Sequence, residues 1–174
     1  KNSASLEEHL LAKIFQQAME GVAYMHASGI THNDLKPDNL FVMDDFQPHY
    51  VPRIVVGDYG CATVTKQIYS IRFGDPRYMS PEAIDNLHNH LWNGNHPQAR
   101  KLITNVGPPI DVWAMGVTIY AVLSGDVVPF LYDRCDLKEF SLKFKKFTDA
   151  VTDMKTTVEF PHWGFSQESQ ILLK

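Results

Sequence analysis

The sequence predicts a single, mainly α-helical domain with a small amount of β structure, and three observations support this. One is an amphipathic helix near the N-terminus, and another is an almost wholly apolar helix from about Ile110 to Leu123. The third is a β-branched run at 53–56, which is typical of a short strand. With 174 residues, 44% of them hydrophobic, the chain can bury one core of ordinary size.

The first helix is predicted to begin at Ser5, because Ser5 and Glu8 have the spacing of a capping box. Gly29 is predicted to end it. Between them, apolar residues recur every three or four positions, as in a half-buried helix. These residues are Leu10, Leu11, Ile14, Phe15, Ala18, Val22 and Met25.

Three further segments can be assigned from their composition and spacing. Pro108 and Pro109 preorganise the start of the apolar helix. The span from 39 to 58 is rich in turn formers and predicts a surface excursion. A further helical stripe between 137 and 151 is predicted to pack on the core, with its lysines in solvent. Its apolar members are Leu137, Phe140, Phe144, Phe147 and Val151.

The stretch from His32 to Asn39 combines a carboxylate, a cation and an amide within eight residues. Its sequence, His-Asn-Asp-Leu-Lys-Pro-Asp-Asn, resembles the catalytic loop of a protein kinase. The resemblance implies that Asp34 orients the attacking hydroxyl and accepts its proton, and that Lys36 lies against the transferring phosphoryl group. It also implies that Asn39 offers its side-chain oxygen to a magnesium ion.

Three more segments follow in the order of that family. Gly57-Asp58-Tyr59-Gly60 resembles the Asp-Phe-Gly element, Met79-Ser80-Pro81-Glu82 resembles Ala-Pro-Glu, and the run from Asp111 to Val117 resembles the buried helix beneath the catalytic loop. The resemblance implies that Asp58 holds the magnesium that bridges the ATP phosphates. It further implies that Asp111 anchors the loop backbone and that Phe41 lies on the floor of the adenine pocket. The implied cofactors are ATP and Mg²⁺.

The resemblance also implies a fold class and a domain boundary. The family fold is α+β, and residues 1–174 would form most of its mainly helical C-terminal lobe, with a short β-hairpin at the catalytic cleft. The chain has no Gly-x-Gly-x-x-Gly loop and no strand with the family's lysine, so the N-lobe of the same parent chain and the last helices are expected to lie outside it. The arginine that would pair with Glu82 is expected beyond Lys174. We expect the isolated fragment to lack activity and to expose an apolar patch.

Two positions depart from the family pattern. Asn33 replaces the arginine that in many relatives clamps a phosphate on the activation segment, so control through the hydroxyls of that segment is not expected. Those hydroxyls belong to Thr63, Thr65, Tyr69 and Ser70. Asp75 stands where serine/threonine kinases usually carry threonine. It is expected to be able to accept a bond from Lys36 and, as a second carboxylate near Asp34, to raise the pKa of one of the two. Three interpretations of Asp75 remain open: it mimics a phosphate, it tunes the catalytic base, or it marks weakened catalysis.

An insertion at 87–97 is rich in turn formers and histidine. A solvated loop is the favoured interpretation, and a metal site formed by His88, His90 and His96 is the alternative. For Cys61, a small packed residue is favoured over a redox or metal role. With Cys135 it shows no disulfide framework, which fits a reducing, cytoplasmic compartment.

The Asp-Leu-Lys-Pro pattern around Lys36 resembles the serine/threonine branch. The segments around Leu123-Ser124-Gly125 and Phe160-Pro161-His162-Trp163 resemble the calcium- and calmodulin-regulated group. Asp38 occupies a position that in some relatives pairs with an arginine upstream of the phosphoacceptor, which implies a basic substrate motif. The alternative to an active kinase is a pseudokinase that serves as a binding or regulatory scaffold.

Charge, hydropathy and missing motifs argue against a nucleic-acid-binding, membrane-spanning or calcium-binding chain. A net charge of −4 provides no basic face for nucleic acid. No apolar run approaches the eighteen or so residues of a membrane span, and no signal-peptide pattern or calcium-binding loop occurs.

Overall fold

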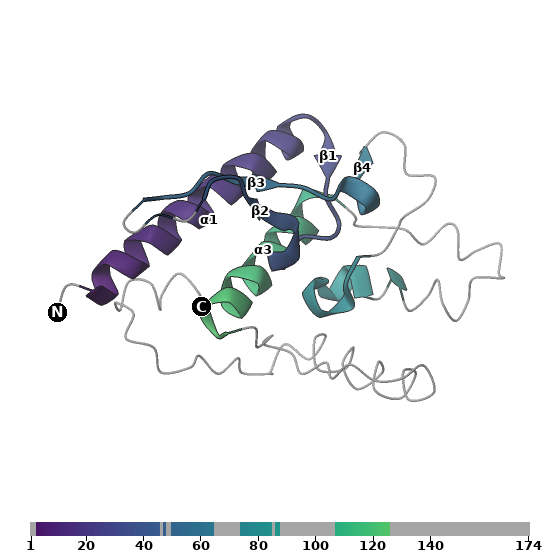
Figure 1. Ribbon diagram of the computed structural model, residues 1–174. Coiled ribbons are helices and arrows are strands. Elements are labelled where there is room, and N and C mark those ends of the chain that lie inside the picture. Colours follow the sequence, from purple (N-terminus) through teal and green to yellow (C-terminus); the bar gives the residue numbers. More distant parts are fainter. Residues whose placement is uncertain are drawn as a thin grey trace, which may run out of the picture.

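The computed structural model describes residues 3–45, 47, 50–64, 74–84, 86–87 and 107–125. Two helices and two small antiparallel sheets make up most of this part (Figure 1). The helix predicted at 137–151, the histidines of the insertion, Cys135 and the calmodulin-group segments after Gly125 lie outside the described residues. Neither of the two helices in the described part is both long and apolar enough to cross a membrane.

Helix α1 spans Ser3–Ala27, so it begins two residues before the predicted start. Its C-terminus confirms the prediction. Gly29 adopts φ 74°, and its amide donates to the carbonyl of His26 at 2.9 Å. A left-handed residue after the last turn is the usual way to end a helix, and glycine adopts it without steric cost. The chain can therefore reverse immediately into the next strand.

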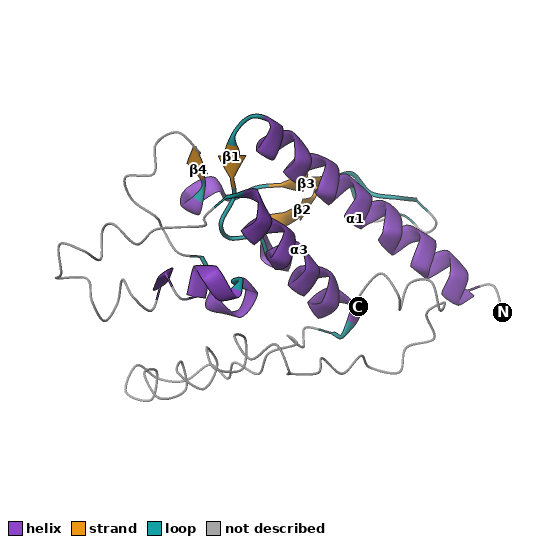
Figure 2. Cartoon of the chain, turned by 180° about the vertical axis from the view of Figure 1, so that it is seen from behind, coloured by secondary structure: helices purple, strands orange, loops and turns teal. Residues whose placement is uncertain are grey.

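Helix α3 spans Pro108–Leu123 and confirms the predicted buried helix, although it begins two residues earlier. Pro108 and Pro109 occupy its first positions, where no amide is needed for a helical hydrogen bond. Half of its sixteen residues are buried, including Met115 and Ala121. Figures 1 and 2 view the molecule from opposite sides, and both show α1 and α3 side by side with the strands near them.

Two short ladders connect the helices to the loops. Strand β1 (Ile30–Thr31) pairs with β4 (Thr63–Val64), and strand β2 (Leu40–Val42) pairs with β3 (Ile54–Val56). The β2–β3 pair is a hairpin, as predicted, with Leu40 opposite Val56. In β3, Ile54 and Val56 are buried while Val55 is exposed, so alternate side chains point toward α1.

The connection between β2 and β3 runs over the surface where it is described. The Asp44 carboxylate closes it by accepting from the amide of Arg53 at 2.7 Å. Gln17 of α1 ties the same strand to the helix, because its Nε2 donates to the Pro52 carbonyl at 2.9 Å and its Oε1 accepts from the amide of Ile54 at 3.1 Å. Gln17 therefore adds two hydrogen bonds to the apolar packing that holds the hairpin on α1.

The core lies between α1, β3 and α3 and extends to the segment after residue 75. Leu87 belongs to it, since residues 86–87 are helical and Leu87 is buried. The prediction of a solvated insertion beginning at Leu87 is therefore wrong for that residue, because its side chain packs in the core. The buried apolar members include Ala18, Val22, Met25, Leu35, Ile54, Val56, Tyr78, Met79, Ile84, Ile110, Ala114 and Met115.

Candidate active site

Asp111 anchors the loop that follows β1. Its side chain is fully buried, and its two carboxylate oxygens accept from the amide of His32 at 2.7 Å and from the amide of Asn33 at 2.9 Å. His26, near the end of α1, places its Nε2 2.8 Å from Asp111 Oδ2. The sequence predicted this anchor. The contribution of His26 was missed, because nothing in the sequence pairs positions 26 and 111.

Asp34, Lys36 and Asn39 come together within that loop. Lys36 Nζ donates to Asp34 Oδ2 at 3.2 Å, and Asn39 Nδ2 donates to the Asp34 carbonyl at 2.7 Å. A 3₁₀ turn over Pro37–Asn39 makes this possible, because it carries Asn39 back over the residues that precede it. The Asp34 side chain is only 11% exposed, so water solvates its charge poorly. The charge of Lys36, which bonds to it directly, offsets this.

Asp58 lies two residues beyond the end of β3, as predicted. It adopts φ 58°, in the left-handed region, and its Oδ1 accepts from the amide of Gly60 at 3.3 Å. The backbone of Gly57 joins it to the loop. The Gly57 amide donates to the Asn39 carbonyl at 3.0 Å, and the Gly57 carbonyl lies 2.9 Å from His32 Nε2. These bonds join the residue before Asp58, which is itself exposed, to His32 and Asn39 of the loop.

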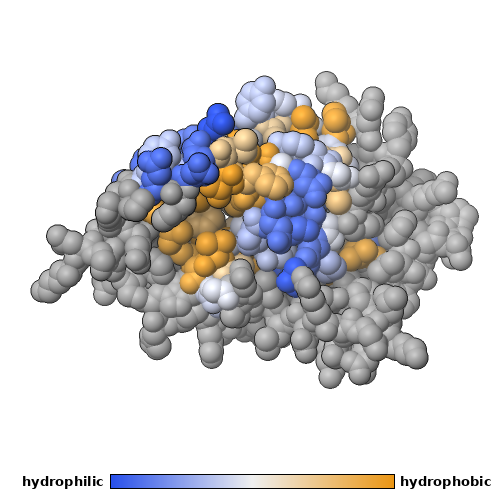
Figure 3. All heavy atoms as spheres, viewed as in Figure 1, coloured by the Kyte–Doolittle hydropathy of each residue, from blue (hydrophilic) through white to orange (hydrophobic). Residues whose placement is uncertain are grey.

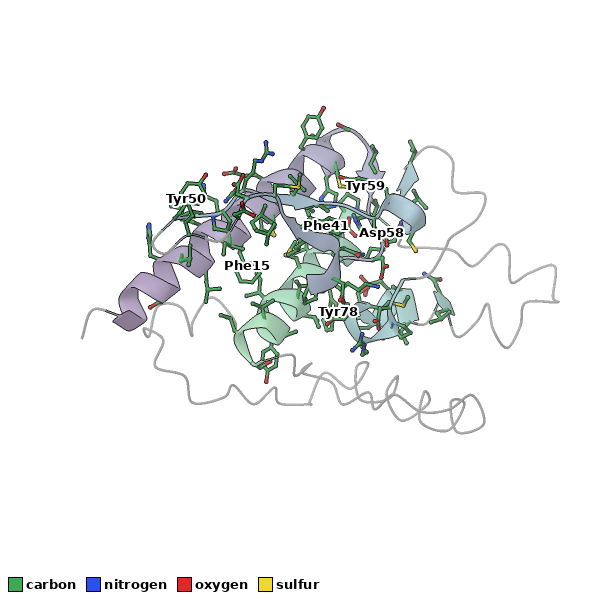
Figure 4. All side chains as sticks on the ribbon, in the orientation of Figure 1. Phe15, Phe41, Tyr50, Asp58, Tyr59 and Tyr78 are labelled. Atoms are coloured by element: carbon green, nitrogen blue, oxygen red, sulfur yellow. The ribbon has the colours of Figure 1, made fainter. Side chains whose placement is uncertain are left out.

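Phe41 lies on β2 beside this point, and Figure 4 shows its ring near Asp58. Phe41 is 46% exposed, and its ring rests on the backbone of Gly57. A Cβ atom at position 57 would lie 2.7 Å from Phe41 Cδ2 and closer still to Cε2. The ring therefore occupies space that only glycine leaves open, a relation between distant residues that the sequence did not reveal.

The segment Gly74–Asp75 closes the other side of Asp34. The amide of Asp75 donates to Asp34 Oδ1 at 2.8 Å, so each carboxylate oxygen of Asp34 has a donor. The carboxylate of Asp75 instead binds Arg77, whose Nη2 and Nε lie 2.6 Å and 3.0 Å from its oxygens. The amide of Arg77 donates to the same carboxylate at 3.1 Å.

Arg77 changes the expected effect of burial on Asp75. Burial alone would raise the pKa of Asp75, but the hydrogen bonds and charge of Arg77, together with the charge of Lys36, hold it below its ordinary value of 3.8. The same pair raises the pKa of Arg77. The expectation of a raised pKa is therefore wrong for Asp75, because the guanidinium neutralises the carboxylate. Position 77 was missed, although its spacing from Asp75 is short enough to suggest a pair.

The structure gives fewer contacts for the remaining predicted positions. Glu82 is half-buried in a helical turn at 81–84. Cys61 is half-buried, and its carbonyl accepts a hydrogen bond from Asn33. Of the activation-segment hydroxyls, only Thr63 belongs to the described residues. Within the described part, no group of three or more His, Cys, Asp or Glu residues is arranged to hold a metal.

The oxygen atoms near Asp58 nevertheless suit a magnesium ion that also binds phosphates. Mg²⁺ commonly takes one or two protein oxygens and completes its shell with water and substrate phosphates. Asn39 directs its Nδ2 to Asp34, which leaves the amide oxygen for a cation. Asp58 uses Oδ1 for the Gly60 amide, which leaves Oδ2. These two residues therefore provide the kind of donors that Mg²⁺ prefers.

Comparisons with known proteins identify the family of the chain. The family model for the protein kinase domain matches residues 1–174. Serine/threonine-protein kinase H1 of Homo sapiens is 34% identical over 134 residues, which cover 75% of this chain and 27% of that protein. The Wee1-like protein kinase of Oryza sativa subsp. japonica is 29% identical over 117 residues, or 67% of this chain and 18% of that protein.

A third relative covers more of the chain. The CaM kinase-like vesicle-associated protein of Danio rerio is 26% identical over 158 residues, which cover 91% of this chain and 31% of that protein. The chain thus belongs to the protein kinase family, with serine/threonine kinases among its relatives. It spans less than a third of the length of each of these relatives.

Proposed function

We propose that residues 1–174 are most of the C-terminal lobe of a serine/threonine protein kinase that transfers the γ-phosphate of ATP to protein hydroxyls. One observation carries the proposal. The loop that holds Asp34, Lys36 and Asn39 is bonded through Gly57 to the segment that presents Asp58. Phosphoryl transfer depends on positioning and on charge stabilisation, and this arrangement supplies groups for both.

In this proposal Asp34 is the catalytic base. A carboxylate offers about four acceptor positions, so the bonds from Asp75, Lys36 and Asn39 still leave room for a substrate hydroxyl. Asp34 orients that hydroxyl and accepts its proton. Lys36, already 3.2 Å from Asp34, offsets the negative charge that gathers between the base and the phosphate.

Asn39 and Asp58 would hold Mg²⁺, and Phe41 would form part of the surface beneath the adenine. When bound, the ion neutralises the phosphate oxygens. The aromatic face of Phe41 is accessible for such a contact, since 46% of the residue is exposed. Its ring is held from below by Gly57.

The acceptor is proposed to carry a basic residue near the phosphorylated position. Asp38 lies on the exposed side of the 3₁₀ turn, within electrostatic reach of Arg77. Because Arg77 already binds Asp75, the charge of Asp38 is only partly compensated. A peptide array read with the full-length protein and its Asp38→Asn variant tests this, and no preference for arginine or lysine in the unmodified protein would refute it.

Residues 1–174 alone are expected to transfer no phosphate, because the chain carries no Gly-rich loop or N-lobe lysine to complete the ATP site. Apolar side chains gather beside a hydrophilic band in Figure 3. The exposed apolar residues of β2, of the position that follows it and of β3 are Phe41, Val42, Met43 and Val55. Magnesium-dependent phosphate transfer by purified residues 1–174 would contradict the expectation that they are inactive alone.

The deciding experiment is transfer of radiolabelled phosphate from ATP to a basic protein by the full-length protein. The Asp34→Asn variant should lose at least about a hundredfold in rate, since it removes the base while keeping the shape of the side chain. Asp45→Asn is the matched control, because Asp45 is exposed on the hairpin loop. Equal rates for Asp34→Asn and the unmodified protein would refute the role of Asp34. No transfer by any form would favour a pseudokinase scaffold.

A further inference from the structure

Asp75 makes two different kinds of contact beside the proposed base. Its backbone amide donates to Asp34 Oδ1 at 2.8 Å. Its carboxylate binds Arg77 instead, accepting from Nη2 at 2.6 Å, from Nε at 3.0 Å and from the Arg77 amide at 3.1 Å. Asp75 therefore supplies a donor to Asp34 while its negative charge is paired with a neighbour.

Local structure holds Arg77 in this position. The 3₁₀ turn over Pro76–Tyr78 begins directly after Asp75 and brings the amide of Arg77 back to the Asp75 carboxylate. Tyr78 is buried in the core, so the turn is anchored from inside. The guanidinium carbon of Arg77 lies 5.5 Å from the centre of the Tyr78 ring. The carboxylate and the guanidinium are therefore held together by the backbone as well as by their charges.

Partial burial makes this pair stronger than an ordinary surface pair. The side chains of Arg77 and Asp75 are 20% and 18% exposed, so water screens their attraction only in part. Two guanidinium nitrogens bind one carboxylate, which is a strong geometry for such a pair. A carboxylate that is so poorly solvated is costly to leave without a cation.

Lys36 is the other cation that acts on Asp75. Burial raises the pKa of Asp75, but the hydrogen bonds and charge of Arg77 and the charge of Lys36 outweigh it. Among the ion pairs of the described residues, Lys36 is joined to Asp34 and Asp75 to Arg77. An ammonium carries three hydrogens, so Lys36 could bind a second carboxylate as well. Without Arg77, Lys36 is the cation that the Asp75 carboxylate would turn to.

We propose that Arg77 is a positioning residue that keeps the Asp75 carboxylate away from Lys36, so that Lys36 stays available to the transferring phosphoryl group. The inference rests on the proposed kinase function and adds a supporting residue to it. The threonine that is usual at this position in serine/threonine kinases has no charge for a cation to hold. The carboxylate of Asp75 creates the need for a partner, and Arg77 meets it.

Removing the charge of Arg77 should lower kcat more than it changes KM. An Asp75 carboxylate bound to Lys36 would neutralise the ammonium that offsets charge during transfer. Arg77→Met keeps the apolar stem, and its kcat should fall roughly thirtyfold while the KM for ATP changes less than about threefold. Arg77→Gln takes its place if Arg77→Met does not fold. Arg53→Met is the matched control, because Arg53 is exposed, and it should keep kcat within about twofold.

A double-mutant cycle in the full-length protein shows whether Arg77 acts through Asp75. Asp75→Asn removes the charge that Arg77 holds and keeps the shape of the side chain. In the Asp75→Asn background, Arg77→Met should lower kcat by less than about threefold, because no carboxylate remains to bind Lys36. A loss of roughly thirtyfold in both backgrounds would show that Arg77 acts independently of Asp75 and would overturn the inference.

Chemical cross-linking gives a readout that needs no activity. A carbodiimide joins a carboxylate to a lysine amine in contact with it, with loss of water, and mass spectrometry identifies the linked residues. In the full-length protein, Lys36 should link to Asp34. The Lys36–Asp75 link, measured relative to Lys36–Asp34, should rise at least about threefold in Arg77→Met and stay unchanged in Arg53→Met. An unchanged ratio in Arg77→Met would overturn the inference.

Together, the two readouts distinguish failure of this inference from failure of the kinase proposal. Transfer by the unmodified protein, with no rise of the Lys36–Asp75 link in Arg77→Met, refutes the role of Arg77 and leaves the kinase proposal standing. A rise of that link without a loss of kcat also overturns the inference, because Lys36 would then act regardless of Asp75. A rise of the link in a protein that transfers no phosphate supports the contact and refutes the kinase proposal.

Discussion

Replacing Gly74 by alanine tests how tightly the segment after 73 closes on Asp34. A Cβ atom at position 74 would lie 2.5 Å from the Asn33 carbonyl oxygen and 2.7 Å from Asp34 Cβ, and it would also clash with Asp34 Oδ1. Real Cβ atoms essentially never approach other atoms within 3.0 Å. Because one of these neighbours is backbone anchored by Asp111, the segment at 74–75 must move instead.

The size of the effect follows from the bond that this movement breaks. The Asp75 amide donates to Asp34 Oδ1 at 2.8 Å, and a shift of about half an ångström or more away from Asp34 weakens it steeply. A hydrogen bond to a charged group contributes about 2 kcal/mol, which corresponds to about a thirtyfold change in rate. We therefore expect Gly74→Ala to lower kcat/KM for a peptide acceptor by about thirtyfold.

The assay is steady-state peptide phosphorylation by the full-length protein, with the KM for ATP measured in parallel. The KM for ATP should stay within about twofold, because the atoms nearest to a Cβ at position 74 belong to Asn33 and Asp34 and not to the residues proposed for the ATP site. Gly116→Ala is the matched control, since a Cβ atom there meets nothing within 4 Å and alanine favours the helix. Unchanged kcat/KM for Gly74→Ala would refute the reasoning.

Three further predictions follow from the same geometry. Gly57→Ala should force the ring of Phe41 to turn and raise the KM for ATP roughly tenfold, with no change in the KM for the peptide; an unchanged KM for ATP would remove Phe41 from the ATP site. Asp111→Asn should lower the free energy of unfolding in urea by about 2–3 kcal/mol, because one acceptor oxygen cannot replace two; a loss under about 0.5 kcal/mol would contradict this. Because the pKa of Asp75 lies below 3.8, its pair with Arg77 should stabilise the protein above that pH and lose this contribution as the pH falls through the lowered pKa. The stability difference between the protein and Asp75→Asn should accordingly be constant near neutral pH and shrink in acid; a difference that is already lost between pH 7 and pH 5 would contradict it.

Much of the fold could be predicted from local patterns. The spacing of Ala18, Val22 and Met25 predicted the buried face of α1, and all three are buried. The run before Asp58 predicted a strand, and β3 forms there. The helix starts were each wrong by two residues, because the first turn of a helix leaves its amides unpaired and so restrains the start only weakly.

The interactions around the site could be predicted only in part. The sequence placed Asp34 and Asp75 near one another and implied that their charges would conflict. The structure shows Arg77 binding Asp75, which lowers its pKa. Leu87 was assigned to a surface loop by its polar neighbours, and its side chain is buried. In both cases the outcome depends on the direction in which a side chain points, that of Arg77 or of Leu87, and the sequence does not specify that direction.

The sequence by itself determined which chemical groups this protein carries and in what order, because helical periodicity and motif spacing are local properties of the chain. It also determined that Asp34, Lys36 and Asn39 would share one loop. Only the tertiary structure decided which residues outside the motifs support the site: His26 lies 85 positions before Asp111 in the sequence, yet its Nε2 lies 2.8 Å from Asp111 Oδ2, and Arg77 binds Asp75. The physical reason is that hydrogen bonds and close packing act over a few ångströms in space, whatever the separation along the chain.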